Sequence, residues 1–164
     1  MGYSTGFGSG VLIWESGLLV AHELPGLVAH ELPGNSRRCK NTPAPLTPGS
    51  QDEKFLVRQL ESYFSGKQVT FNIDDLPLDR TAWTSFQQEV ADALVKIPYG
   101  LTTTYAALAA KAGHPGAQRA VGNFMAANSF PVIIPCHRVI RSDGSFGRYS
   151  AGDDWKPLLL GIER

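Results

Sequence analysis

The segment FPVIIPCHRVI, residues 130–140, is the most informative stretch of this sequence of 164 residues. An apolar run delivers Cys136 directly after a rigid proline and directly before His137 and Arg138. A free cysteine is most often one more buried apolar residue. Cationic neighbours, however, lower the pKa of a thiol and favour the reactive thiolate. The local context therefore favours a nucleophilic cysteine over a structural one.

The position of His137 leaves two routes open for the proton of the thiol. Neighbouring side chains on an extended chain point to opposite sides, so His137 would not touch the Cys136 sulfur if a strand ran through both residues. Either the backbone turns here, or a water molecule carries the proton between the two side chains. The adjacent pair is also unlike a protease dyad, whose cysteine and histidine come from distant segments.

Upstream of the cysteine, two helices with a short connection predict a helix-turn-helix. The first begins after the threonines at 102–104 and ends at Gly113. The second starts at Pro115, because the first turn of a helix tolerates proline, and it continues to about residue 127. Small residues dominate this second helix. They suit close packing against a neighbouring helix and close approach to a nucleic-acid backbone equally well.

The first half of the chain predicts a smaller domain of strands and one helix. Residues 19–34 are two copies of the eight-residue unit LVAHELPG, which we interpret as a local duplication that lengthens a hairpin or loop. Residues 35–50 are polar and carry three prolines, which is typical of a loop. The spacing of apolar residues then predicts a helix from residue 51 to Gly66 and a strand over 68–73.

We therefore expect an α/β (α+β) fold with two domains. Residues 1–78 would form a small sheet-plus-helix domain. Residues 79–164 would form a mainly helical domain that carries the helix-turn-helix and the reactive cysteine. A further helix is predicted at about 81–96.

The charge balance limits how this chain could bind nucleic acid. It has 15 basic and 15 acidic residues, so it lacks the overall positive field of a typical DNA-binding protein. Contact with nucleic acid must come from a local patch, for which the candidates are Arg119, Arg138, Arg141 and Arg148.

The sequence also predicts a compartment. The two cysteines, Cys39 and Cys136, are too few for a disulfide framework. No apolar run has the length of a membrane span, and the first residues lack the features of a signal peptide. We expect a cytoplasmic protein with no membrane contact, which reaches the nucleoid if the source is bacterial or archaeal.

The run IPCHRV, residues 134–139, resembles the active-site signature of the O6-alkylguanine-DNA alkyltransferases. The resemblance extends over about residues 82–163. Other positions that match the family are Tyr105 in the first helix of the pair, Arg119-Ala120-Val121-Gly122 in the second, Asn128 at the hinge, Gly147-Arg148-Tyr149-Ser150 in the pocket loop, and Glu163 near the end.

The resemblance implies DNA repair by one irreversible transfer of an alkyl group from O6 of guanine to Cys136, with O4-alkylthymine as an alternative substrate. The second helix of the pair, including Ala120 and Gly122, would enter the minor groove of double-stranded DNA. Arg119 would fill the gap left by the rotated base, which must leave the stack before the sulfur can reach it.

The resemblance also assigns the chemical roles. Glu163, His137 and a water molecule would take the proton of the thiol, and Tyr105 would donate a hydrogen bond to the guanine ring. Asn128 would act at the hinge. The backbone at Cys136 and Val139, together with Tyr149 and Ser150, would form the base pocket. From the residues alone, Tyr105 is a core aromatic, Asn128 a helix C-cap and Glu163 a solvated tail residue.

Two departures from the family bear on DNA affinity and on the pocket. Asn123-Phe124 replaces a smaller pair, and Ala126-Ala127 lacks a basic residue, so DNA binding would be weaker. Ala151 stands where several relatives have glycine, which would narrow the pocket.

The sequence argues against two other functional classes. A non-catalytic lesion-binding relative would lack Cys136. An unrelated thiol hydrolase would need an oxyanion hole, and the sequence offers none that is recognisable. In the N-terminal part, His22, His30 and Cys39 fall short of the four ligands of a structural zinc site. We expect no metal, no cofactor and a monomer.

Overall fold

The computed structural model describes residues 2–25, 51–149 and 151–164. Several features of the sequence lie outside the described residues: the second copy of the repeated unit with His30, the polar segment at 35–50 with Cys39, and Ser150. In the part of the chain that is described, no helix is both long enough and apolar enough to cross a membrane.

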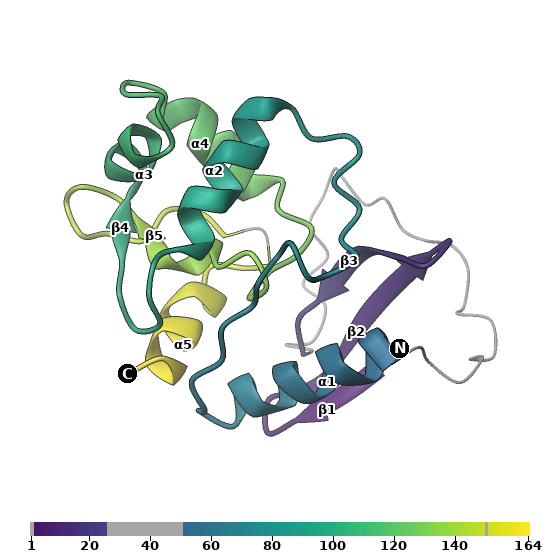
Figure 1. Cartoon of the computed structure of the whole chain (residues 1–164). Coiled ribbons are helices and arrows are strands. Elements are labelled where there is room, and N and C mark those ends of the chain that lie inside the picture. The colour runs from purple at the N-terminus through teal and green to yellow at the C-terminus, as the bar shows by residue number, and fades with distance from the viewer. Residues whose placement is uncertain (1, 26–50, 150) are drawn as a thin grey trace.

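A three-stranded antiparallel sheet and one helix form the N-terminal part (Figure 1). The strands, in spatial order, are β1 (Gly2–Thr5), β2 (Gly8–Glu15) and β3 (Leu18–Glu23). Helix α1 (Gln51–Phe64) has the predicted periodicity and buries Leu56, Leu60, Tyr63 and Phe64. Gly66 follows its end with φ of 82°, a backbone conformation that glycine adopts without steric cost.

The strand predicted over residues 68–73 is wrong. The segment forms no strand, yet Val69 and Ile73 are buried in the core. Its alternating apolar residues therefore reflect burial of a loop rather than a hydrogen-bonded ladder. The chain pairs with the sheet only after this loop: Leu19 N donates to Pro77 O at 2.7 Å, and Asp79 N donates to Leu19 O at 2.8 Å.

The C-terminal part is mainly helical. Its helices are α2 (Ser85–Val95), α3 (Tyr105–Lys111), α4 (Gln118–Ala126) and α5 (Trp155–Ile162). Two short parallel strands, β4 (Thr103–Thr104) and β5 (Val139–Ile140), join the start of α3 to the segment after the cysteine. Figure 1 shows α2, α3 and α4 grouped away from the sheet. This arrangement confirms the mixed α/β class.

Caps explain where these helices begin. The Thr84 side chain accepts from Gln87 N while the Gln87 side chain accepts from Thr84 N, so α2 starts at residue 85, later than the predicted 81. Thr104 caps α3, which starts in the predicted region. Helix α4 starts three residues later than predicted, because Pro115 lies in the connection and Gly116 follows it with φ of 88°.

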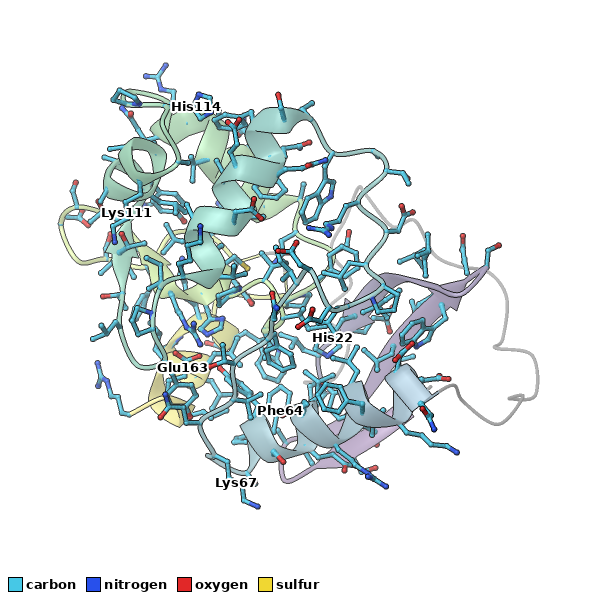
Figure 2. All side chains as sticks on the ribbon, viewed as in Figure 1. His22, Phe64, Lys67, Lys111, His114 and Glu163 are labelled. Carbon is cyan, nitrogen blue, oxygen red and sulfur yellow. The ribbon has the colours of Figure 1, made fainter. Side chains whose placement is uncertain are left out.

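A buried histidine joins the sheet to the segment that leads to the cysteine. His22 on β3 is labelled in Figure 2 and is 4% exposed. Its Nδ1 lies 2.7 Å from Pro131 O. A carbonyl can only accept, so Nδ1 donates and Nε2 accepts from the Tyr3 hydroxyl at 2.6 Å. The backbone adds a bond from His22 N to Ser129 O at 2.9 Å. The N-terminal sheet therefore holds the loop just before Cys136.

Candidate active site

The apolar run before the cysteine folds into a buried, tightly turned loop. Residues 130–139 are all buried, and Ile134 N donates to Phe130 O at 2.8 Å. Val132 has φ of 72°, which is costly for a β-branched residue. Cys136 then begins a single 3₁₀ turn, Cys136–Arg138. The backbone therefore turns at the cysteine, so the side chains of Cys136 and His137 are not held on opposite sides as they would be on a strand.

Asn128 ties this loop to the cysteine. Its Nδ2 donates to Cys136 Sγ and to Ile134 O, both at 3.0 Å, and its Oδ1 accepts from Phe130 N at 3.0 Å. The helix C-cap is Ala127, one residue earlier, so the Asn128 side chain serves the loop rather than the helix end. The side chain is buried and uses both ends of its amide, which fixes the direction of the sulfur.

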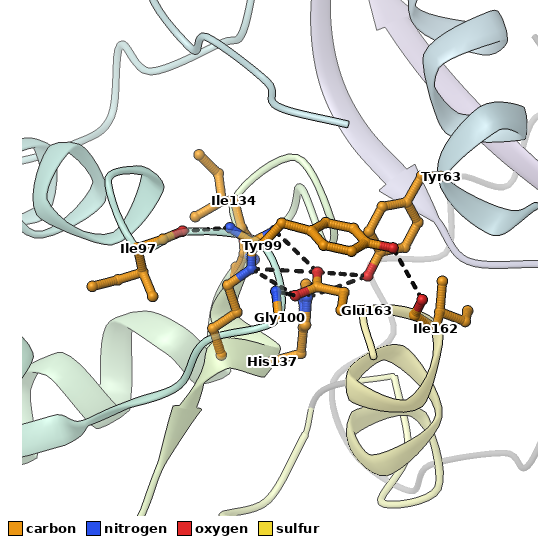
Figure 3. Close-up of polar contacts among 10 residues, drawn as sticks. Tyr63, Ile97, Tyr99, Gly100, Ile134, His137, Ile162 and Glu163 are labelled. Carbon is orange, nitrogen blue, oxygen red and sulfur yellow. Dashed lines mark hydrogen bonds and ion pairs between the residues drawn. The ribbon is translucent and has the colours of Figure 1, made fainter. Parts of the chain in front are cut away.

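Glu163 lies at the centre of a second buried network (Figure 3). Its Oε1 is 2.7 Å from His137 Nε2, and Arg138 donates to both carboxylate oxygens, with Nε 3.0 Å from Oε2 and NH2 3.0 Å from Oε1. Gly100 N donates to Oε2 at 3.0 Å. The Tyr63 hydroxyl donates to Oε1 at 2.9 Å. The carboxylate is therefore fully engaged, and it is not a solvated tail residue.

These contacts determine the charges of Glu163 and His137. Burial would raise the pKa of Glu163, but hydrogen bonds from His137 and Arg138 lower it to about 2, so it is ionised at neutral pH. Burial lowers the pKa of His137, although Glu163 opposes this. A neutral imidazole that donates from Nε2 leaves Nδ1 as an acceptor, and Nδ1 has no hydrogen-bond partner among the described residues. His137 is thus poised as a base.

The thiol itself differs from the sequence prediction. Burial raises the pKa of Cys136, although hydrogen bonding from Asn128 and the charge of Lys156 oppose it. The adjacent cations do not supply the expected stabilisation of a thiolate, because Arg138 is paired with Glu163 and His137 is neutral. The resting thiol is protonated, so a nearby base is needed.

Two tyrosines and a lysine complete the surroundings of the sulfur. Lys156 is 1% exposed, and its Nζ donates to the Tyr105 hydroxyl at 3.4 Å. Burial and the charge of Cys136 both raise the pKa of Tyr105. The Tyr149 hydroxyl, which is buried, lies beside the Cys136 sulfur and interacts with it. Its pKa is raised by burial and by the nearby sulfur. These groups can donate to a substrate beside Cys136.

The remaining predicted residues lie on α4 and in the loop after β5. Arg119 and Ala120 are exposed, and Gly122 is half-buried, 4.0 Å (measured from a Cβ placed on it) from the Tyr105 ring. Val139 is fully buried in β5. Arg141 and Arg148 are exposed. Arg138 is wrong as a candidate for a surface patch, because its guanidinium is buried against Glu163 and the Ile97 carbonyl.

Sequence reasoning missed the roles of Tyr63 and Lys156. Lys156 could have been found from its spacing, because it shares the buried face of α5 with Leu159 and Leu160, where a charged residue needs a reason. Tyr63 offered no such signal, since an aromatic residue on the apolar face of α1 is ordinary. Within the described residues, no group of three or more histidines, cysteines and carboxylates could hold a metal ion.

Comparison with protein families and sequences gives concordant matches. The model of the 6-O-methylguanine DNA methyltransferase DNA-binding domain matches residues 85–164. A methylated-DNA–protein-cysteine methyltransferase of Methanosarcina barkeri is 46% identical over 116 residues, which are 69% of this chain and 71% of that protein. A constitutive methylated-DNA–protein-cysteine methyltransferase of Bacillus subtilis is 41% identical over 126 residues, 76% of this chain and 72% of that protein.

Solved structures extend the likeness over both parts of the fold. The crystal structure of Mycobacterium tuberculosis OGT in complex with DNA is similar to this chain with a TM-score of 0.75 and 34% sequence identity. The match covers 99% of this chain and 90% of that one, so it includes the N-terminal sheet and α1.

Proposed function

The chain belongs to the 6-O-methylguanine DNA methyltransferase family, and on that premise we propose that Cys136 is the cysteine that takes the alkyl group. The protein repairs DNA by transferring an alkyl group to a cysteine, the activity of a methylated-DNA–protein-cysteine methyltransferase. The proposal depends on the placement of the Cys136 thiol. The thiol accepts a hydrogen bond from Asn128, and the next residue in the sequence is the buried base His137.

Transfer begins with loss of the thiol proton. His137 takes this proton at Nδ1 through a water molecule, and the imidazolium is stabilised by its bond from Nε2 to the ionised Glu163. Asn128 and the charge of Lys156 favour the thiolate over the thiol once the proton has left. The resting thiol stays neutral in its buried site until then.

The thiolate attacks the alkyl carbon on O6 of guanine. The sulfur–carbon bond forms as the carbon–O6 bond breaks, and the electron pair of that bond goes to the purine. Tyr105 donates a hydrogen bond to the guanine ring as this negative charge develops, and Lys156 supports it at the Tyr105 oxygen. The thioether is stable, so each molecule reacts once.

The base must leave the DNA stack to reach Cys136, a residue that is only 2% exposed. In this proposal α3 and α4 act as the helix-turn-helix, and α4 enters the minor groove with Ala120 and Gly122 against the backbone. Arg119, exposed on α4, fills the space of the rotated base. Tyr149 and Val139 line the pocket, and Ser150 is proposed to bind the base with them.

We also propose that the protein is a monomer and that it acts in the cytoplasm, with access to the nucleoid if the source is bacterial or archaeal. The division into residues 1–78 and 79–164 belongs to the same proposal, and the start of the family match at residue 85 supports it.

Intact mass spectrometry after mixing with duplex DNA that contains O6-methylguanine tests the acceptor. The chain should gain the mass of one methyl group, on the peptide that contains Cys136, and then stop. Cys136→Ser should gain nothing and still bind DNA, because a serine hydroxyl remains protonated near neutral pH and is a poor nucleophile toward carbon. Cys39→Ser is the matched control and should react like the wild type. An adduct on Cys39, or repeated turnover, would overturn the proposal.

A further inference from the structure

Among the described residues, Glu163 receives one hydrogen bond from outside the C-terminal part. The donor is Tyr63, which lies on α1, 100 positions earlier in the sequence, and is 1% exposed. Its hydroxyl lies 2.9 Å from Glu163 Oε1 and 3.3 Å from His137 Nε2 (Figure 3). The other donors to this carboxylate, His137, Arg138 and Gly100, all come from the C-terminal part.

The Tyr63 hydroxyl remains a neutral donor at any working pH. Burial raises its pKa far above the usual value, and the negative charge of Glu163 raises it further. A donor that keeps its proton restrains the carboxylate oxygen that also accepts from His137. Since a hydrogen bond to a charged group is stronger than one between neutral groups, loss of the Tyr63 bond should change how strongly Glu163 stabilises the imidazolium.

Packing fixes the phenol in this position. The Tyr63 ring meets the ring of Tyr99 edge-on at 6.1 Å and that of Phe64 at 5.3 Å. Its centroid is 6.3 Å from the imidazole of His137. With three rings around it, the hydroxyl has little freedom to leave Glu163.

We propose that Tyr63 is a positioning residue for alkyl transfer, through which α1 of the N-terminal part controls the acid–base pair His137–Glu163. The inference rests on the proposed role of Cys136 and His137. It gives the N-terminal part a direct effect on the chemistry of the site, because the Tyr63 hydroxyl reaches Glu163 only when α1 is packed against the C-terminal helices.

Removal of the hydroxyl should make His137 easier to protonate. Without Tyr63, more of the carboxylate charge is available to the imidazolium, so the pKa of His137 rises and the base is lost at a higher pH. The other charged and titratable groups that act on His137 are Glu163, Arg138 and Lys156, and all three remain in a Tyr63→Phe variant. The phenylalanine ring keeps the aromatic packing.

The test is the pH profile of single-turnover methyl transfer at saturating DNA. Tyr63→Phe should move the acid limb of the profile to higher pH by about half a unit to one unit, so the rate at a given pH on that limb falls about threefold to tenfold. The plateau at higher pH should stay near that of the wild type. Tyr99→Phe is the matched control, because its hydroxyl donates to the Ile162 carbonyl rather than to Glu163; its profile should match the wild type.

A second variant and a second readout separate positioning from a structural effect. In a Glu163→Gln background, Tyr63→Phe should not shift the profile further. NMR titration of the His137 imidazole in unreacted protein should show the same displacement without DNA. An unchanged acid limb in Tyr63→Phe, or an equal shift in Tyr99→Phe, would overturn the inference. Failure of the wild type to gain a methyl group would instead overturn the proposed function.

Discussion

Protonation of His22 should destabilise the folded protein as the pH falls below neutral. Burial lowers the pKa of this histidine from 6.5 to about 4, although its bond to the Pro131 carbonyl opposes the shift. The folded protein therefore keeps His22 neutral over a range in which the unfolded chain binds a proton. Since the unfolded state then binds more protons, stability is full above about pH 6.5 and is lost progressively toward pH 4.

The size of the effect follows from the difference between the two pKa values. Each pKa unit is worth about 1.4 kcal/mol, so the full loss below pH 4 is about 3 kcal/mol. Between pH 7 and pH 5 the linkage relation gives a loss of about 2 kcal/mol from His22. This is a large share of the 5–15 kcal/mol that is typical of a folded domain.

Urea unfolding followed by tryptophan fluorescence at pH 7 and pH 5 measures this loss. His22→Asn keeps an amide that can donate to Pro131 O and has no group that titrates in this range. It should be less stable than the wild type at pH 7, yet lose about 2 kcal/mol less on going to pH 5. Tyr99→Phe is the control, because it removes a hydroxyl that bonds to the Ile162 carbonyl and not to His22, and so should retain the pH dependence. The same loss in His22→Asn as in the wild type would refute the reasoning.

Further predictions concern the pocket and the DNA. Gly147→Ala should slow methyl transfer about tenfold, because a Cβ at this position would lie 2.5 Å from the Tyr105 hydroxyl and displace it. The factor corresponds to the loss of about one hydrogen bond, and an unchanged single-turnover rate would contradict this. Arg119→Ala should slow repair of duplex DNA much more than reaction with free O6-methylguanine, which needs no base rotation, and equal losses would remove Arg119 from that role. Because the protein has zero net charge, it should contact only about two to four phosphates. A plot of the logarithm of the DNA-binding constant against the logarithm of the salt concentration should then have a slope of only about −2 to −4. A much steeper slope would show a larger basic surface.

Local signals in the sequence predicted the helices better than the strands. Helix α1 was anticipated because its apolar period and the stop at Gly66 are both local, and α3 because Thr104 caps it. The false strand at 68–73 has the right alternation but pairs with none of the described strands, and pairing is decided by the rest of the fold. The parallel pair β4–β5 was not predicted. Each of its strands has only two residues, which is too short for a pattern, and their pairing is also decided by the rest of the fold.

The sequence by itself determined the chemical identity of the candidate site. A cysteine between a proline and a His-Arg pair, with Tyr105, Asn128 and Glu163 in register, was enough to indicate the family, and it predicts Cys136 as the acceptor. These are properties of residue type and spacing, and they do not depend on how distant segments pack.

Only the tertiary structure decided the state of those residues. The adjacent cations suggested a thiolate, yet burial raises the pKa of Cys136, and Arg138 is turned away to Glu163. The bond from Tyr63 to Glu163 joins residues 100 positions apart. A pKa is set by lost hydration and by the charges that folding brings within a few ångströms, and neither quantity is encoded in local spacing.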